Sequence, residues 1–308
     1  MKSIQKAYQE EIDYISGRMN GTIRSMKTRW KRLNAAGIDG LEYGTINIIA
    51  AMSGVGKTTL ANQLVFDAIN LNKEDDIAVL FFTVEMSARR LISRYISSQL
   101  SIPVKDIYKS PPEIQDKIKK EIAPTITDFD IVYEEGMYSP AKIIQKIREF
   151  CKARIDKKCI IIYDHSLLIR RSAGQSERDA LIDLSMQCNM AKKVFPNSIF
   201  FIVSQLNRDI ETPERIAKKQ LHYPKKSDIF GSDALFQIAD VVLVLHDPAK
   251  LHIKRYGPEE LPVKGLVYAH LLKVREGKPG NFVLKNHAHI NKFPELTLTE
   301  LTQYGFKR

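Results

Sequence analysis

The sequence predicts an α/β fold in which a mostly parallel, twisted sheet carries helices on both faces. From Tyr43 onward, short apolar runs alternate with helical patterns, as a series of βαβ units requires. A glycine-rich turn at 51–59 follows the first apolar run and opens a helix. Several later apolar runs end in polar side chains, and a parallel sheet gathers such strand ends at one edge.

Composition and length exclude several classes of protein. The 308-residue chain is 44% hydrophobic and 27% charged, as a globular protein with a large core would be. Its apolar runs are too short to cross a bilayer, and its first residues lack the pattern of a signal peptide. The three cysteines show no paired spacing, which argues against a disulfide framework or a zinc site. We therefore expect a cytoplasmic protein without a membrane partner.

The net charge of +11 suggests a polyanionic partner. Much of the excess falls in short basic runs, so some of these runs could line a nucleic-acid path. A scattered, solvated surface explains the same composition, and composition alone leaves both readings open.

Hydrophobic spacing places the elements in order. Residues 4–15 carry apolar side chains at helical spacing and predict an amphipathic helix, which a basic connector at 17–21 follows. Residues 101–127 are a polar insertion of short surface helices, and residues 207–231 lack periodicity. Other helical patterns stand at 60–69, 87–100, 140–154, 176–194 and 233–239. Apolar runs predict strands that end near residue 50 and strands at 77–84, 131–133, 159–163, 198–204, 241–245, 266–274 and 282–289, the last two forming a hairpin.

These elements divide the chain into a short N-terminal helix at 1–17 and one domain at 18–308. An isolated helix of this length is marginal in water and needs a surface on which to pack. Either it folds back onto its own domain, or it docks on a neighbouring subunit.

The turn at 51–59 reads Ala-Met-Ser-Gly-Val-Gly-Lys-Thr-Thr and predicts a phosphate-binding loop. Its glycines let backbone N–H groups turn towards a polyphosphate, and the new helix presents its positive end to the same charge. Lys57 would reach the β- and γ-phosphates, and the Thr58 hydroxyl would ligate Mg²⁺. Ala51 occupies a position where glycine is usual, and an ordinary glycine turn is the alternative. The predicted nucleotide-binding residues are Ser53, Gly54, Val55, Gly56, Lys57, Thr58 and Thr59.

Three strand ends carry side chains suited to hydrolysis of a triphosphate. Glu85, after the second strand, could orient or deprotonate the attacking water. Asp164 closes the apolar run at 160–163 and would complete the magnesium site with Thr58. Gln205 ends the strand at 198–204 and could bond a γ-phosphate, a bond that hydrolysis would break. Each of these residues is also a common strand terminus, so the prediction depends on the set together with the loop.

Several short motifs, in the same order along the chain, resemble the replicative ring helicases of the DnaB family. Residues 204–208 read Ser-Gln-Leu-Asn-Arg, as in that family, and residues 82–87 are similar to its strand ending in Leu-Glu-Met. Residues 28–34 resemble its Thr-Gly-Phe-x-x-Leu-Asp segment, with Arg29 in place of the glycine. The resemblance spans about residues 18–294 and includes further matches at 231–232, 239–240 and 273–277.

The resemblance implies a RecA-like ATPase core that assembles as a ring, usually a hexamer, and moves 5′→3′ along single-stranded DNA with ATP and Mg²⁺. It also implies that Lys273 and Arg275 of one subunit reach the triphosphate held by the next. An arginine supplied in trans can raise the hydrolysis rate by about 10³–10⁵. The alternative for both residues is a solvated face of an edge strand, which their spacing fits as well.

The same resemblance bears on partners and location. The cellular members of the family carry an N-terminal domain that meets primase, and the helix at 1–17 resembles their linker helix, which docks on the adjacent subunit. A trimmed core of this kind is common in phage-encoded sets. We therefore expect a helicase core in the host cytoplasm, with a primase or a helicase loader as candidate partners.

The resemblance places two DNA-contacting loops at about 170–178 and 225–232. The candidate DNA-binding residues are Arg170, Arg171, Lys225, Lys226, Gly231 and Ser232. Residues 229–230 read Ile-Phe where the family has Arg-Glu, and residues 164–166 read Asp-His-Ser where it has Asp-Tyr-Leu. The second departure leaves the metal carboxylate of Asp164 intact.

Two other classes of function share part of this pattern. A RecA-like strand-pairing or annealing recombinase would use the same loop and strand-end residues, but the motif at 204–208 and the pair Lys273 and Arg275 favour the helicase. A small-molecule kinase would need an arginine-rich lid and no trans residue, and the continuation of the sheet after Gln205 disfavours it.

Overall fold

The computed structural model describes residues 2–166 and 168–306, with every side chain in these ranges except that of Ser232. Within them the strands form a single eight-stranded sheet in the order β3-β2-β4-β5-β1-β6-β7-β8. The strands are β1 Thr45–Ala51, β2 Ile77–Thr83, β3 Asp130–Glu134, β4 Lys158–Asp164, β5 Ser198–Gln205, β6 Val241–His246, β7 Leu266–Val274 and β8 Gly280–Lys285.

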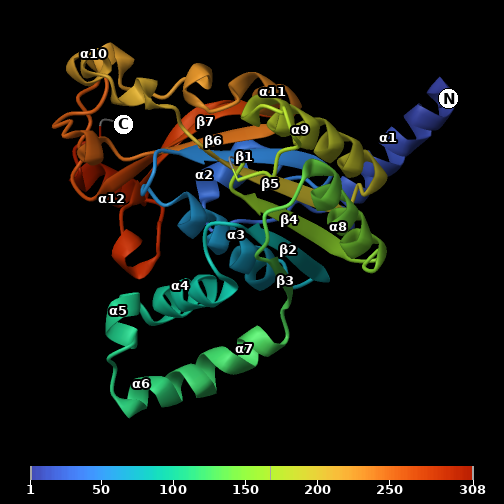
Figure 1. Cartoon of the computed structure of the whole chain (residues 1–308), viewed down its shortest axis with the longest axis horizontal. Helices are drawn as coiled ribbons and strands as arrows, with labels where there is room; N and C mark the ends of the chain where they lie inside the picture. Colours follow the sequence, from blue (N-terminus) through green and yellow to red (C-terminus); the bar gives the residue numbers. More distant parts are fainter. Residues whose placement is uncertain (1, 167, 307–308) are drawn as a thin grey trace.

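The sheet is parallel from β3 to β6, and β7 and β8 join it antiparallel as a hairpin. Apart from the half-buried edge strand β3, the parallel strands are buried apolar runs, as a sheet covered on both faces requires. Figure 1 shows helices on both sides of the sheet. The predicted α/β class, the mostly parallel sheet and the C-terminal hairpin are confirmed.

The chain direction decides which face each helix covers. Right-handed crossovers put α3 on one face and α8, α9 and α11 on the other. The helices are α1 Ile4–Met19, α2 Lys31–Ala36, α3 Lys57–Leu71, α4 Ala88–Leu100, α5 Val104–Ile107, α6 Pro112–Lys117, α7 Ala123–Thr127, α8 Pro140–Lys152, α9 Glu177–Val194, α10 Pro213–Ala217, α11 Ser232–Ile238 and α12 Leu298–Gln303.

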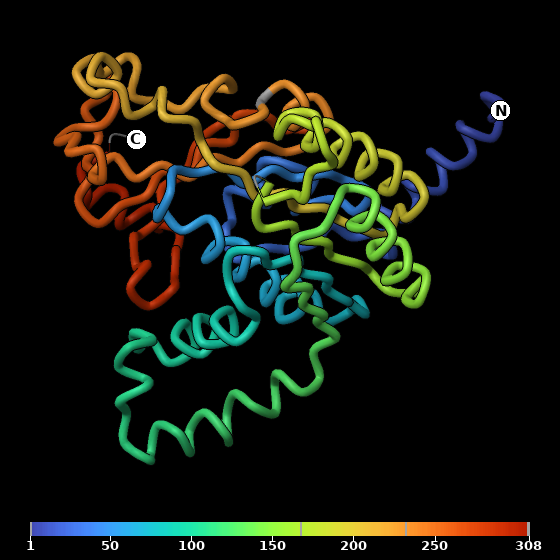
Figure 2. The backbone as a smooth tube through the Cα atoms, viewed as in Figure 1, coloured from blue at the N-terminus to red at the C-terminus, as the bar shows by residue number. Residues whose placement is uncertain are grey.

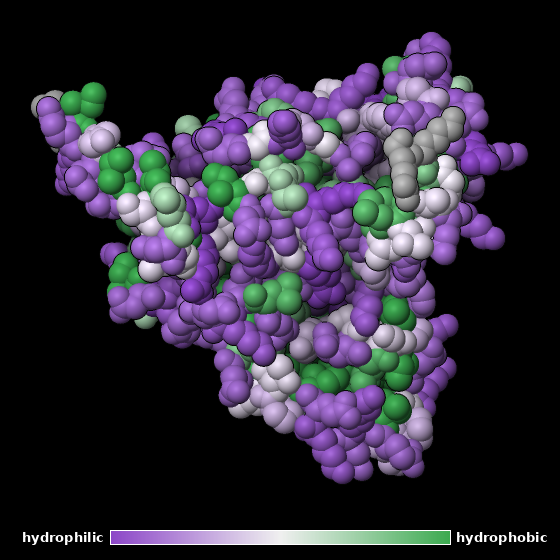
Figure 3. Space-filling model, turned by 180° about the vertical axis from the view of Figure 1, so that it is seen from behind, coloured by the Kyte–Doolittle hydropathy of each residue, from purple (hydrophilic) through white to green (hydrophobic). Residues whose placement is uncertain are grey.

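Two segments stand away from the body in Figure 2. One is the run α5–α7, which extends from the end of α4 and returns to β3, where the sequence predicts a polar insertion of short helices. The other is α1, which projects from the opposite side of the molecule. Its apolar side chains are exposed, Ile4 at 78% and Tyr8 at 66%, and hydrophobic groups are visible along this projection in Figure 3. Within this subunit, therefore, the apolar face of α1 has no covering surface among the described residues.

The N-terminal approach to the sheet is held by two buried contacts. Trp30 is fully buried, and its indole Nε1–H donates to the Phe293 carbonyl at 2.8 Å. Arg29, which stands where the family that the motifs resemble has glycine, pairs its guanidinium with Asp67 of α3 at 2.7 Å. The Asp67 side chain is only 4% exposed, so Arg29 supplies the countercharge that a buried carboxylate needs.

One predicted strand is too long. The run at 282–289 predicts a strand that would include His287 and His289, but β8 ends at Lys285, where its pairing with β7 ends. Residues Ala288–Ile290 form a 3₁₀ turn, which Asn291 ends at a positive φ of 55°. Asn286 turns towards the neighbouring loop and donates to Asp247 at 2.9 Å. His287 and His289 therefore do not share a strand face.

The described helices include none that is long and apolar enough to cross a membrane.

Candidate nucleotide-binding site

The predicted phosphate loop connects the end of β1 to the start of α3, at the centre of the sheet. β1 pairs with β5 so that Ala51 lies beside Gln205, and α3 begins at Lys57. Gly56 has a φ of 115°, and a Cβ there would lie 2.5 Å from the Phe293 ring. The backbone conformation and the lack of space both require glycine at this position.

Lys57, Thr58 and Asp164 converge beneath the loop. The Thr58 hydroxyl donates to Asp164 Oδ2 at 2.6 Å, across 106 residues of sequence. Lys57 Nζ donates to the Met52 carbonyl at 3.3 Å, and burial lowers the pKa of its ammonium. An ammonium held inside the loop, with its charge only partly compensated, favours binding of a polyphosphate.

Asp164 is a buried carboxylate with spare ligand capacity. Its exposure is 2%, and burial raises its pKa to about 6 despite the Thr58 hydrogen bond and the nearby Lys57 charge. Its Oδ1 atom is buried without a hydrogen-bond partner in the part of the chain that the structure describes. An unpaired carboxylate oxygen next to a threonine hydroxyl is the donor set that a hydrated Mg²⁺ prefers, so these residues fit that ion.

Glu85 lies at the same edge of the sheet but is more open to solvent. Its side chain is 59% exposed, and its Oε2 lies 3.6 Å from His165 Nε2. Burial lowers the pKa of the His165 ring, although the Glu85 charge acts in the opposite direction. Burial is the main cause of the raised pKa of Asp164, and the nearby Glu85 charge adds to it. A partly solvated carboxylate here can accept a proton from water.

Gln205 completes this edge between the two acidic strand ends and the loop. Strand order places it on β5, with Asp164 on β4 to one side and Ala51 on β1 to the other. Its side chain is half-buried. The structure thus brings together the loop, Glu85, Asp164 and Gln205 at the carboxyl ends of four strands.

The sequence reasoning missed two further cations at this edge. Arg94 of α4 is close enough to Asp164 and Glu85 for their charges to act on it, and burial lowers the pKa of its guanidinium. Its one sequence signal is an arginine beside the buried Leu91 and Tyr95 of α4. Lys250 donates to the Gly54 carbonyl from the turn after β6. No local pattern marks Lys250, because only the pairing of β1 with β6 brings it there.

Lys273 and Arg275 lie at the other end of the strands from the phosphate loop, where the parallel strands begin. β7 runs antiparallel to β6, so Val274 pairs with Val241 at the start of β6, whereas Ala51 pairs with Leu245 near its end. Lys273 Nζ donates to the Phe236 carbonyl at 2.7 Å, and burial, followed by the Arg275 charge, lowers its pKa. The strand geometry therefore separates both residues from the phosphate loop of the same chain.

The two predicted DNA loops lie near each other. Arg170 and Arg171 are exposed after β4, and Lys225 and Lys226 are exposed after β5. Asp233 lies 3.7 Å from Arg178 of α9 and 3.3 Å from Lys226, and so links the two segments.

The Ile-Phe departure in the second loop has a structural explanation. Ile229 is 2% exposed, and its backbone forms an isolated antiparallel β-bridge with Leu206. Its side chain therefore packs inward and is not presented to a ligand. Gly231 begins α11 with a positive φ of 64°. The side chain of Ser232 lies outside what the structure describes.

Comparison with known sequences gives consistent matches over most of the chain. The family described as "DnaB-like helicase C terminal domain" matches residues 25–295. The chain is 28% identical over 243 residues to the "Replicative DNA helicase DnaB" of Leifsonia xyli subsp. xyli, covering 77% of this chain and 50% of that protein. It is 25% identical over 304 residues to the "Replicative DNA helicase DnaB" of Geobacillus stearothermophilus, covering 96% of this chain and 62% of that protein. The chain therefore spans only about half of the first relative and less than two thirds of the second.

Solved structures show the same fold. The "ATPase Domain of G40P" superposes with a TM-score of 0.78 at 21% identity and covers 96% of this chain and 99% of its own. A "DnaB-Like Replicative Helicase", described with "Its Interactions With Primase", has a TM-score of 0.76 at 21% identity, covering 96% of this chain and 68% of its own. The predicted RecA-like core is confirmed as the fold.

Proposed function

Because the chain belongs to the DnaB-like helicase C-terminal domain family, we propose that it is the ATP-hydrolysing motor of a replicative DNA helicase. The family resemblance inferred from the sequence motifs is confirmed by this membership. The motor assembles as a ring, a hexamer, moves 5′→3′ along single-stranded DNA and separates the strands of a duplex. A cytoplasmic location, the host cytoplasm for a phage-encoded chain, is part of the same proposal.

The observation that carries the proposal is that the proposed catalytic groups lie at opposite ends of the strands. The phosphate loop, Asp164 and Glu85 lie where the parallel strands end, whereas Lys273 and Arg275 lie where they begin. A single subunit cannot bring both sets to one triphosphate without breaking the β6–β7 pairing. In a ring with head-to-tail contacts, the side of each subunit that carries Arg275 faces the phosphate loop of the next subunit. Hydrolysis is then coupled to the geometry between subunits.

Each side chain has a definite task around the phosphate loop. The N–H groups of residues 53–59 and the Lys57 ammonium bind the phosphates. Thr58 and Asp164 would hold Mg²⁺, which, when bound, would supply positive charge to offset the charge that develops on the phosphates. Glu85 orients the attacking water and accepts its proton, and Gln205 senses the γ-phosphate through a hydrogen bond. Arg275 of the adjacent subunit stabilises the charge of the transition state.

Single-stranded DNA is proposed to bind the two basic segments that follow β4 and β5. Their exposed cations contact phosphates, which makes binding tolerant of sequence and sensitive to salt. The candidate contacts remain Arg170, Arg171, Lys225, Lys226, Gly231 and Ser232.

The exposed apolar face of α1 supports a role in assembly. Residues 1–17 would serve as a docking helix, separate from the domain at 18–308, because α1 projects into solvent with Ile4 and Tyr8 uncovered. Docking on a neighbouring subunit would bury that face and hold the ring together. Primase or a helicase loader is a further proposed partner, in line with the interactions described for the solved DnaB-like helicase.

Strand release from a forked duplex with a 5′ single-stranded tail tests the proposal. The wild-type chain should release the labelled strand only with ATP and Mg²⁺, and Lys57→Ala should abolish release. A fork with only a 3′ tail is the directional control. ATP-independent annealing of complementary strands without any release would favour the strand-pairing alternative and contradict the helicase.

A further inference from the structure

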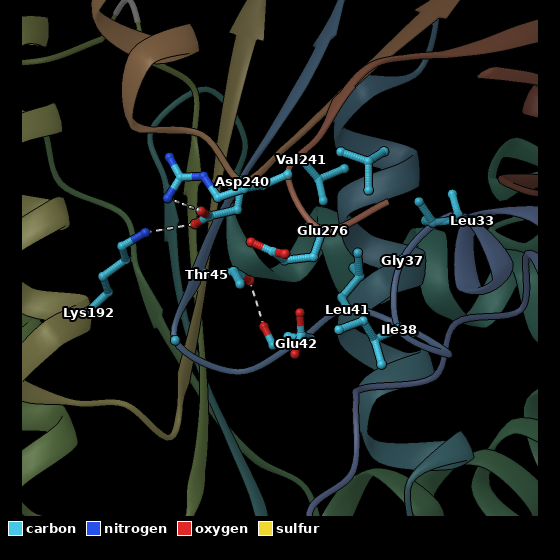
Figure 4. Close-up of a pocket in the computed structure, with 15 residues that line it drawn as sticks. Leu33, Gly37, Ile38, Leu41, Glu42, Thr45, Lys192, Asp240, Val241 and Glu276 are labelled. Atoms are coloured by element: carbon cyan, nitrogen blue, oxygen red, sulfur yellow. Dashed lines mark hydrogen bonds and ion pairs between the residues drawn. The ribbon is translucent and has the colours of Figure 1, made fainter. Parts of the chain in front are cut away.

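Asp240, between α11 and β6, lies at the centre of a small buried ion network. Its side chain is 9% exposed, and its Oδ1 forms an ion pair with Arg275 Nη1 at 2.9 Å. Its Oδ2 accepts from Lys192 Nζ at 2.7 Å and from the Ile46 backbone N–H at 2.8 Å. Figure 4 shows the Lys192 ammonium pointing towards this carboxylate.

The backbone around Asp240 is held as firmly as its side chain. Its N–H donates to the Ile46 carbonyl at 2.7 Å, and its own carbonyl accepts from the Arg275 N–H at 2.8 Å. Three strands, β1, β6 and β7, therefore meet at this residue. A carboxylate with both oxygens engaged on such a support has little freedom to move.

Arg275 is held on one side only. Its side chain is 49% exposed, and Asp240 is the sole acidic group that pairs with it among the described residues. A guanidinium has five N–H donors, so an ion pair through Nη1 leaves Nη2 and Nε available to donate to another anion. The residue also borders a cavity of about 240 Å³, between β7 and the segment 37–45, shown in Figure 4.

We propose that Asp240 is the positioning residue for Arg275, holding one edge of the guanidinium so that the other edge points at the triphosphate of the adjacent subunit. The inference rests on the proposed function, because it assumes that Arg275 acts in trans. Lys192 pairs with Oδ2, the second oxygen of the carboxylate, and is not needed to orient Arg275. Without Asp240 the long arginine side chain samples many rotamers, and few of them reach the next subunit.

Two variants separate positioning from simple stabilisation. Lys192→Met removes one ion pair of Asp240 and leaves Arg275 held, whereas Asp240→Asn combined with Lys192→Met also removes the charge that orients Arg275. The double variant leaves no buried ammonium without a countercharge, which favours folding. We expect kcat for ATP in the double variant to fall about tenfold to hundredfold below that of Lys192→Met. KM for ATP should stay nearly constant, since the phosphate loop is intact. Equal kcat values in the two variants would overturn the proposal.

A mixing experiment tests whether the defect acts across the subunit boundary. Lys57→Ala subunits have a disabled loop but an intact Arg275, so mixed rings with the Asp240→Asn, Lys192→Met variant should regain ATPase activity. Arg275→Ala mixed with Lys57→Ala serves as the reference. Recovery in both mixtures supports the proposal, and recovery in the reference alone overturns it. If neither mixture recovers, the trans arrangement in the proposed function is itself contradicted, and the inference with it.

Discussion

Replacing Asp164 with asparagine should stabilise the nucleotide-free protein while abolishing hydrolysis. The carboxylate is 2% exposed, and its pKa is raised from 3.8 to about 6, chiefly by burial. Ionised Asp164 therefore lowers the free energy of unfolding, and bound metal and nucleotide would offset that loss. Asparagine keeps an oxygen that can accept the Thr58 hydrogen bond and removes the charge.

The magnitude follows from the difference in proton affinity between folded and unfolded chains. A rise of about two pKa units corresponds to about 3 kcal/mol at 1.36 kcal/mol per unit. Because the folded pKa is the higher one, the stability that this group contributes is present below pH 3.8 and is lost as the pH rises to about 6. Asp164→Asn should therefore exceed the wild type by up to about 3 kcal/mol at pH 8 and by about half of that at pH 5.

Urea unfolding of the nucleotide-free proteins at equal protomer concentration, at pH 5 and pH 8, measures this difference. Asp130→Asn is the matched control: the Arg154 hydrogen bond lowers the pKa of Asp130, so its loss should destabilise the protein at pH 8. Added Mg²⁺-ATP should stabilise the wild type more than Asp164→Asn, because the variant keeps the phosphate loop but lacks one of the two proposed metal ligands. An Asp164→Asn protein that is less stable than the wild type by the same amount at both pH values would refute the reasoning.

Three further predictions concern the loop, the core and the assembly. Gly56→Ala should add roughly 1–3 kcal/mol of strain at the loop and weaken ATP binding in a titration with a fluorescent nucleotide, whereas Gly280→Ala, which meets no atom within 4 Å, should not. Trp30→Ala should lower the free energy of unfolding by about 3–5 kcal/mol in chemical denaturation, because a fully buried indole and its bond to Phe293 are lost; a loss under 1 kcal/mol would contradict this. Deletion of residues 1–16 should lower the oligomer mass in light scattering, and an unchanged mass would rule out docking by α1.

The sequence could predict most of the residues around the phosphate loop, because the patterns that mark them are local. A glycine turn between an apolar run and a helix specifies the phosphate loop, and an acid or amide at a strand end needs only the sheet to bring it near. Glu85, Asp164 and Gln205 are found together for that reason. The predicted strand at 282–289 is too long, since apolar alternation cannot show that β8 loses its pairing partner after Lys285.

By itself, the sequence determined the α/β class, the family and the residues of the phosphate loop, because each depends on neighbours within a few positions of one another. Only the tertiary structure decided the contacts that join distant segments. The bond from Lys250 to Gly54 spans 196 residues, and the network of Asp240 joins Ile46, Lys192 and Arg275. The physical reason is that strand order in the sheet, rather than separation along the chain, sets which side chains meet. The antiparallel direction of β7 also places Arg275 at the opposite end of the strands from the phosphate loop of its own chain. The proposed catalytic site therefore includes a neighbouring subunit.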